Sequence, residues 1–323
     1  MFLPATFALC TLLGLGIAVP EPRLLDPVRT IFQFPPNTFF ENLAVRSNGE
    51  ILTGLLNEPQ LFAVLVHEFT DSLGLAGIAE YEPDVFAVIS GRFDIPTGDV
   101  GPGSWNGNVL SGSPNVSLIA NVASANFLNG ITLLSQSEGT FLLSDVNAGV
   151  VYRLDTQGSY EVVINSTLTN SVPLPPVPPA GVDGLHVHHD GDSKTLYFVN
   201  AGQGFLARVA INDDGTPAGD IEIVARPLDP VDNYDDFTLD CDGNIFLVTG
   251  SGNGSVIAGN VNSTAIAEPT SAAFGRGPND KNILYVSTVG GMERPVNGNI
   301  TIGAQLVAVT TSSQGSAACA LYL

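Results

Sequence analysis

The chain has 323 residues, of which 11 are Lys or Arg and 32 are Asp or Glu, so its formal net charge at pH 7 is −21. A surface this anionic repels nucleic acid and acidic membranes, and we exclude both as partners of the mature protein. The length fits either one ring of short strands or two ordinary domains, and a repeat that runs through the whole chain favours the ring.

Residues 1–18 have the character of a secretory signal peptide. They carry no charged side chain, and the small residues Gly16 and Ala18 suit cleavage before Val19. The apolar run is short and is interrupted by proline and glycine, which argues against a membrane anchor. We therefore expect a protein of the secretory pathway or the extracellular space, whose mature domain spans residues 19–323.

A short motif recurs along the chain, in which a small, carboxamide or acidic pair opens an apolar strand. The six copies are Glu41-Asn42, Ala76-Gly77, Asn129-Gly130, Asp183-Gly184, Asp235-Asp236 and Thr270-Ser271. Their spacing is close to that of propeller blades, and no segment has the periodicity of an amphipathic helix. We predict an all-β fold, a single-domain six-bladed β-propeller, in which the first residues of the inner strands converge on one axis.

Two segments interrupt this repeat. Residues 91–113 are rich in glycine around Trp105 and lack a strand pattern, so we predict a long loop over the ring. Residues 172–181 are rich in proline, and we predict that they form an extended rim segment or a spacer that does not join a sheet.

Cysteine usage and glycosylation signals agree with an oxidising compartment. Loss of the signal peptide removes Cys10 and leaves Cys241 and Cys319, for which we predict a disulfide. Five sequons predict N-glycosylation at Asn115, Asn165, Asn253, Asn262 and Asn299.

The placement of Glu41, Asn129-Gly130 and Asp183-Gly184 in three different blades resembles the SMP-30/gluconolactonase family of six-bladed propellers. In that family these residue types bind one divalent cation on the axis, and the Asp also serves as general base. The resemblance implies a Ca²⁺ site at Glu41, Asn129 and Asp183. The further Asn and the substrate-binding Arg of the family have no clear counterpart here.

The chain also resembles the secreted fungal branch of these propellers, which acts in secondary metabolism. That branch includes hetero-Diels-Alderases, which join a quinone methide of a tropolone to a terpene alkene. The resemblance implies an enzyme of meroterpenoid biosynthesis that couples two small apolar substrates and requires no cofactor. A Ca²⁺-dependent lactonase and a non-catalytic ligand-binding propeller remain as alternatives.

Polar residues at the inner-strand starts are the candidates for chemistry. Carboxylate and amide oxygens that converge on one axis suit Ca²⁺, or else one carboxyl group retains its proton. As acid or base we choose Asp183 and His186, and as donors to a carbonyl oxygen Asn129, His186 and Tyr234. The substrate-binding candidates are Glu41, Phe40, Trp105, Asp235 and Met292.

Other chemistries have weaker support. His186 and His188 lie two residues apart, so in a strand both side chains are on one face, but the sequence offers no convincing third ligand for zinc. There is no Gly-x-Ser-x-Gly elbow for a serine hydrolase and no glycine-rich phosphate loop before a helix. We expect a monomer or a small homo-oligomer that binds a small molecule.

Overall fold

In the part of the chain that it describes, the structure, a computed structural model, contains β-strands and one short 3-10 helix. It describes residues 27–62, 65–94, 99–111, 115–175, 177–227, 234–249, 257–260 and 262–315, so the predicted signal peptide (1–18) lies outside the described residues. The 3-10 helix η1 (Thr264–Ile266) is capped by Ser263, whose side chain accepts a hydrogen bond from the Ala265 N–H. Within these ranges, no helix has the length and apolar character needed to cross a membrane.

The described residues form five antiparallel sheets of four strands each. The first sheet holds β2 (Phe40–Val45), β3 (Ile51–Leu55), β4 (Glu58–Phe62) and β5 (Leu65–Glu68). The second holds β6 (Gly74–Glu82), β7 (Val85–Gly91), β8 (Asn106–Ser111) and β9 (Asn115–Asn121). The third holds β10 (Leu128–Ser135), β11 (Thr140–Asp145), β12 (Val150–Asp155) and β13 (Tyr160–Asn165). The fourth holds β16 (Val182–Asp190), β17 (Ser193–Asn200), β18 (Phe205–Ile211) and β19 (Glu222–Ala225).

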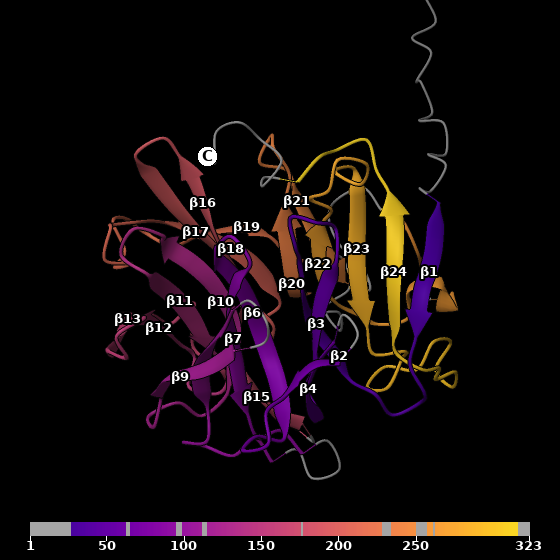
Figure 1. The fold of residues 1–323 in the computed structure, drawn as a ribbon, viewed down its shortest axis with the longest axis horizontal. Helices are drawn as coiled ribbons and strands as arrows, with labels where there is room; N and C mark the ends of the chain where they lie inside the picture. The colour runs from indigo at the N-terminus through magenta and orange to yellow at the C-terminus, as the bar shows by residue number, and fades with distance from the viewer. Residues whose placement is uncertain are drawn as a thin grey trace, which may run out of the picture.

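The last four-stranded sheet joins the two ends of the described chain. It holds β22 (Pro269–Phe274), β23 (Ile283–Thr288), β24 (Gln305–Thr310) and β1 (Val28–Gln33). Strand β1 pairs along β24, and Figure 1 shows the indigo first strand beside the yellow last one. Two further sheets have two strands each among the described residues: β20 (Tyr234–Leu239) with β21 (Ile245–Thr249), and β14 (Val172–Leu174) with β15 (Val177–Ala180).

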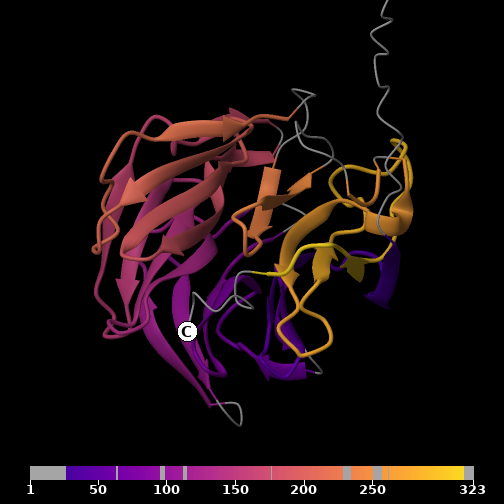
Figure 2. The ribbon, with the colours of Figure 1, turned by 90° about the horizontal axis from the view of Figure 1, so that it is seen from above.

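The first strands of the sheets line a common axis. Strands β2, β6, β10, β16, β20 and β22 contact one another in this order, and β22 in turn contacts β2. Figures 1 and 2 show the sheets arranged around this centre. The prediction of an all-β propeller is confirmed. Five blades are complete in the described residues, where six were predicted, and β20–β21 is a two-stranded sheet between the fourth and the last of them.

The hydrophobic core lies between neighbouring sheets. Leu142 of β11 packs in one cluster with Phe198 of β17 and Phe205 of β18, all fully buried. Phe40 of β2 packs with Leu306 of β24 in another, which joins the first sheet to the last. Burial of both faces explains why middle strands such as β7 and β11 are almost continuously apolar, whereas the outer strands β9, β13 and β19 are largely exposed.

The recurring sequence motif coincides with a bulge in each inner strand. The pairing register shifts at Glu41-Asn42, Ala76-Gly77, Asn129-Gly130, Asp183-Gly184, Asp235-Asp236 and Thr270. A bulge bends the strand and changes the direction of its side chains. Bulges at equivalent places therefore let polar side chains of β2, β10, β16, β20 and β22 meet near the axis.

Glycine at the second motif position allows adjacent blades to approach closely. A Cβ atom on Gly77 would lie 2.4 Å from Asn129 O, and one on Gly184 would lie 2.3 Å from Asp236 Oδ1. Both distances are shorter than any van der Waals contact, so a larger residue would push the blades apart.

Two sequence-based predictions about the interrupting segments are wrong. The glycine-rich region contains β8, because Gly107 leaves the space that Leu154 fills: a Cβ on Gly107 would lie 2.7 Å from Leu154 Cδ2. The proline-rich region forms the β14–β15 hairpin. Proline is tolerated there because both strands of a two-stranded sheet are edge strands.

Candidate functional site

A cluster of polar side chains lies where the inner strands begin. Asn129 Nδ2 donates to Glu41 Oε1 at 3.0 Å, and Asn42 Nδ2 donates to Asn129 Oδ1 at 3.4 Å. These bonds connect β2 to β10 past the intervening strand β6, which has only Ala76 and Gly77 at the equivalent positions. The small residues of β6 thus leave room for the amide and carboxyl groups to meet.

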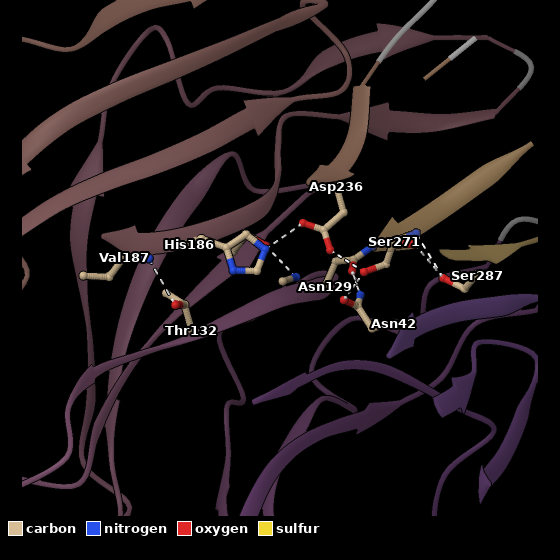
Figure 3. Close-up of polar contacts among 10 residues, drawn as sticks. Asn42, Asn129, Thr132, His186, Val187, Asp236, Ser271 and Ser287 are labelled. Atoms are coloured by element: carbon tan, nitrogen blue, oxygen red, sulfur yellow. Dashed lines mark hydrogen bonds and ion pairs between the residues drawn. The ribbon is translucent and has the colours of Figure 1, made fainter. Parts of the chain in front are cut away.

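Asp236 connects the other side of the cluster. His186 Nε2 lies 3.2 Å from Asp236 Oδ1, and Ser271 donates to Asp236 Oδ2 at 2.6 Å (Figure 3). Ser271 Oγ also lies 3.3 Å from Asn42 Oδ1, so the two halves of the cluster are continuous. We call Glu41, Asn42, Asn129, Asp183, His186, Asp236 and Ser271 the axial cluster.

The backbone beneath Glu41 is fixed by hydroxyl groups of the last blade. Thr270 Oγ1 donates to the Glu41 carbonyl at 3.0 Å, and Ser287 Oγ donates to the same carbonyl at 2.7 Å. All three residues are buried. Hydroxyl donors to a buried bulge carbonyl replace the sheet partner that the bulge removes.

The carboxyl groups of this region resist ionisation. Burial raises the pKa of Glu41 to about 8, against the lowering effect of the Asn129 hydrogen bond, and the charge of Asp236 adds to the rise. Burial and the charge of Glu41 raise the pKa of Asp183 and of the neighbouring Asp235. Several carboxyl groups so close together cannot all be charged, so some retain their protons near neutral pH.

Asp183 has an unusual environment. Its side chain is buried, and Oδ1 has no hydrogen-bond partner among the described residues. A buried polar atom without a partner is costly, and such atoms often face a ligand or a proton. Asp183 Oδ1 is therefore available to bind a cation or to form a hydrogen bond with a ligand.

An axial cavity extends from the cluster between the inner strands. It has a volume of about 340 Å³, and residues of all six inner strands line it. Its walls are mainly apolar and include Leu43, Ile78, Ile131 and Phe274. Such a size and lining suit a small apolar ligand.

Polar groups lie at specific places in this cavity. His186 lines it, with Nε2 directed to Asp236 and the ring packed edge-on against Phe237 at 4.8 Å between centroids. Thr132 also lines it, and its oxygen accepts from the Val187 N–H at 3.2 Å, which leaves the hydroxyl hydrogen available (Figure 3). Glu80 and Arg276 complete the charged lining. The cavity thus combines an apolar body with a few donors.

The structure brings together several of the predicted catalytic and ligand residues. Glu41 and Asn129 are in direct contact, and the charges of Glu41 and Asp236 act on Asp183. His186 links the cluster to the cavity. Asp235 is half-buried beside Asp236. These positions agree with the convergence expected from the inner-strand starts.

Other predicted site residues lie elsewhere. Trp105 is fully buried and donates from Nε1 to Val100 O and Asn126 O, at 2.9 and 3.0 Å, so it anchors its loop in the core. Phe40 and Tyr234 are also fully buried core residues. Met292 is half-buried against the same core cluster as Trp105. None of these four lines the axial cavity.

Sequence reasoning missed the roles of Asp236, Ser271, Thr132 and Arg276. Asp236 and Ser271 share the motif position of Asn42, and this shared position is the signal that could have identified them. Thr132 and Arg276 follow the motif in β10 and after β22, in stretches that resemble ordinary strand and turn sequence. Only the three-dimensional fold brings them to the cavity.

The residues present fit an oxygen-preferring cation but not zinc. Glu41, Asn129 and Asp183 offer two carboxyl groups and an amide, and the unpartnered Asp183 oxygen is the atom that a hard cation such as Ca²⁺ would take. Across the described ranges, no group of three or more His, Cys, Asp and Glu side chains is arranged to hold a metal ion. His188 packs toward Tyr197 and His189 lines a separate surface cleft, so His186 has no second histidine beside it.

The predicted disulfide and glycosylation sites are partly described. The Cys241 N–H donates to Gln314 O at 2.8 Å, which holds the last described residues against this turn, whereas Cys319 lies outside the described residues. The disulfide between Cys241 and Cys319 stays a prediction. The exposed sequon residues are Asn115, Asn165, Asn262 and Asn299, and Asn253 lies outside the described residues.

Comparison with known proteins gives relatives of two kinds. No family model matches the chain. The candidate hetero-Diels-Alderase asR5 of Sarocladium schorii is 26% identical, over 85% of this chain and 80% of the relative. A second candidate hetero-Diels-Alderase, from a Phoma species, is 26% identical, over 81% of this chain and 86% of the relative.

Solved structures share the fold. The calcium-binding protein regucalcin of Agrobacterium tumefaciens aligns with a TM-score of 0.59 at 16% identity, covering 90% of this chain and 97% of its own. A candidate gluconolactonase aligns with a TM-score of 0.57 at 15% identity, covering 90% and 95%. At these identities the alignments establish a shared fold.

Proposed function

We propose that this chain is an enzyme that binds small apolar substrates in the axial cavity and catalyses a hetero-Diels-Alder coupling. The observation that carries the proposal is the cavity itself, an apolar space on the propeller axis with His186 and Thr132 as donors. The names of the curated relatives support the same reaction class. The substrates we propose are a tropolone quinone methide, as heterodiene, and a terpene alkene.

The reaction requires little from the protein beyond alignment. The heterodiene C=C–C=O and the alkene form one C–C and one C–O bond, two π bonds are consumed, one π bond moves, and no atom leaves. Holding both partners in reacting geometry can supply about 7 kcal/mol or more of the barrier reduction. Leu43, Ile78 and Ile131 would form apolar walls for this alignment.

The donors act on the heterodiene oxygen. Negative charge develops on this oxygen as the alkene donates electrons, and hydrogen bonds aimed at it stabilise the transition state. Nε2 of His186 faces Asp236, so His186 donates to the substrate in the form that carries a proton on Nδ1, and Thr132 has a free hydroxyl hydrogen. Asp236, held by Ser271, keeps the imidazole in place.

The test is product formation by a cavity-blocking variant. Ala273 lines the cavity, and Ala273→Phe should fill it and reduce coupling to the background rate. The matched control is Val162→Phe on the outer strand β13, where the residue is 45% exposed and the rate should not change. Full activity of Ala273→Phe would show that coupling does not take place in the axial cavity.

A second function, lactone hydrolysis, is favoured by one observation. The buried Asp183 Oδ1 lacks a partner next to Glu41 and Asn129, and these three residues would hold a Ca²⁺ ion. When bound, such an ion polarises a lactone carbonyl as a Lewis acid. Two results would support this function: loss of lactonase activity with EDTA, and loss of activity in the triple variant Glu41→Ala, Asn129→Ala, Asp183→Ala. Unchanged lactonase activity in the triple variant would exclude it.

We also infer a sixth blade and a secretory route. The β20–β21 sheet packs between its neighbours as a blade does, with Phe237 against Leu206 of one and Val248 against Val286 of the other. Secretion with signal cleavage after Ala18, N-glycosylation and the disulfide between Cys241 and Cys319 complete the proposal.

A further inference from the structure

Arg276 lies at the edge of the axial cavity, in the turn that follows β22. Among the described residues that line the cavity, Arg276 is the one permanent cation, and its side chain is 28% exposed. We propose that Arg276 binds the acidic oxygen atoms of the substrate and so selects a ligand that carries an ionisable enol beside a carbonyl. The inference rests on the proposed function, because it assigns a substrate class to the same cavity.

The guanidinium group is fixed before any ligand binds. Arg276 Nη1 donates to the Val45 carbonyl at 3.0 Å and forms an ion pair with Glu80. These contacts join the turn after β22 to β2 and β6, so one side chain spans three blades. A pre-positioned donor loses little conformational freedom when a ligand arrives.

Glu80 is itself held in one orientation. Its side chain is 14% exposed, and Oε1 accepts from the Asp84 N–H at 2.8 Å while Oε2 faces Arg276. Both carboxylate oxygens are therefore engaged. Glu80 acts as a positioning residue that orients Arg276.

The remaining donors of Arg276 are free for a ligand. Both of its contacts use Nη1, and Nε and Nη2 have no partner within the part of the chain that the structure describes. These two nitrogens form one edge of the guanidinium plane, which matches two neighbouring oxygen atoms. An ionised enol next to a carbonyl, as in tropolone, presents such a pair.

The arrangement also predicts how the substrate lies. The acidic oxygens meet Arg276 at the edge of the cavity, and the reacting part of the molecule lies among the apolar walls toward His186. A neutral terpene has no group for Arg276 and occupies the remaining apolar space. Arg276 thus distinguishes the two substrates by their acidity.

Calorimetric binding of two probes to the full-length protein tests the inference. Tropolone has the ionisable enol, and 2-methoxytropone, its methyl ether, lacks it. The wild-type protein should bind tropolone at least about tenfold more tightly than the ether, and Arg276→Gln should abolish this difference. The matched control is Arg46→Gln, which removes a cation that pairs with Asp84 and Glu50 but does not line the cavity, and it should keep the preference.

The outcomes separate the inference from the proposed function. Equal binding of both probes by the wild type, or a preference that survives in Arg276→Gln, overturns the role of Arg276 and leaves the cavity as the binding site. Failure of the wild type to bind either probe overturns both. If Arg276→Gln does not fold, Arg276→Lys provides the test, because it keeps the charge but not the planar edge. Its preference for tropolone over the methyl ether should be at least about threefold smaller than that of the wild type. Full retention by Arg276→Lys would contradict recognition by the planar edge.

Discussion

His186 Nε2 of β16 lies 3.2 Å from Asp236 Oδ1 of β20, so an imidazole and a buried carboxyl group of adjacent inner strands meet where the axial cavity reaches the axial cluster. Ser271 fixes the other oxygen of Asp236 at 2.6 Å. The contact gives His186 a defined orientation in a pocket that otherwise has few polar groups, and the proposed stabilisation of the substrate oxygen depends on it.

Removal of the His186 ring should reduce the coupling rate. We expect His186→Ala to lower kcat about 10²-fold with a smaller change in KM, because the donor acts mainly on charge that develops in the transition state. His186→Gln, which keeps a donor, should recover part of the rate. Steady-state kinetics of adduct formation provide the measurement, and His189→Ala, in a separate surface cleft, is the control. Unchanged kcat in His186→Ala would contradict the role assigned to His186.

Close approach of two blades at Gly184 should make this position intolerant of a side chain. A Cβ atom there would lie 2.3 Å from Asp236 Oδ1 and 2.7 Å from Asp236 Cα, and the backbone atom cannot move aside alone. Gly184→Ala should lower the free energy of unfolding by about 2 kcal/mol or more. In the control Gly219→Ala, the added methyl group meets no atom within 4 Å, and the change should stay within about 0.5 kcal/mol. Denaturant unfolding of both variants is the measurement, and equal stabilities would contradict the packing argument.

The buried carboxyl groups predict that stability falls as the pH rises. The pKa of Glu41 is raised from 4.5 to about 8, so between these values the folded state binds a proton that the unfolded state has released. The contribution of Glu41 to stability is therefore fully present below about pH 4.5 and is lost progressively as the pH rises toward 8. Glu41→Gln keeps the acceptor for Asn129 and should reduce this dependence, which a series of Tm measurements from pH 5 to 9 would reveal. The surface variant Glu161→Gln serves as the control, and a wild-type Tm that rises over this range would contradict the assignment.

The predicted disulfide should contribute to stability through the unfolded chain. A bond between Cys241 and Cys319 would close a loop of roughly 77 residues, and its loss should cost about 4 kcal/mol in the chain-entropy model. The Cys241 N–H to Gln314 O contact already brings the chain to within five residues of Cys319. Peptide mapping without reduction should recover the linked peptides. Recovery of both cysteines as free thiols would refute the pairing.

Much of the fold follows from local sequence. The six motif pairs predicted where the inner strands begin, because a bulge that opens an apolar strand requires a small or polar pair at a fixed place. The same pairs predicted that Glu41, Asn129 and Asp183 come from different blades and approach one axis. The strand β8 was not predicted because Gly107 is explained by the Leu154 side chain of the next blade, which occupies the space beside it. No local sequence pattern contains this contact.

The details of the site depend on contacts between distant segments. Motif alignment could not determine which of Asp235 and Asp236 faces His186, since a bulge changes the direction of both side chains. Trp105 was expected at a pocket wall because its side chain is large and apolar, but Gly91 provides the space in which its ring is buried. Arg276 reaches Glu80 across two blade interfaces, and only closure of the ring brings these residues together.

The stereochemistry of the coupled product is the most direct test of coupling in the axial cavity. The quinone methide and the alkene should be incubated with and without the purified full-length protein, and the adduct resolved by chiral chromatography. We expect one predominant diastereomer, formed faster than background with the wild-type protein and lost in Ala273→Phe. The same mixture of diastereomers at the background rate, with and without protein, would contradict it.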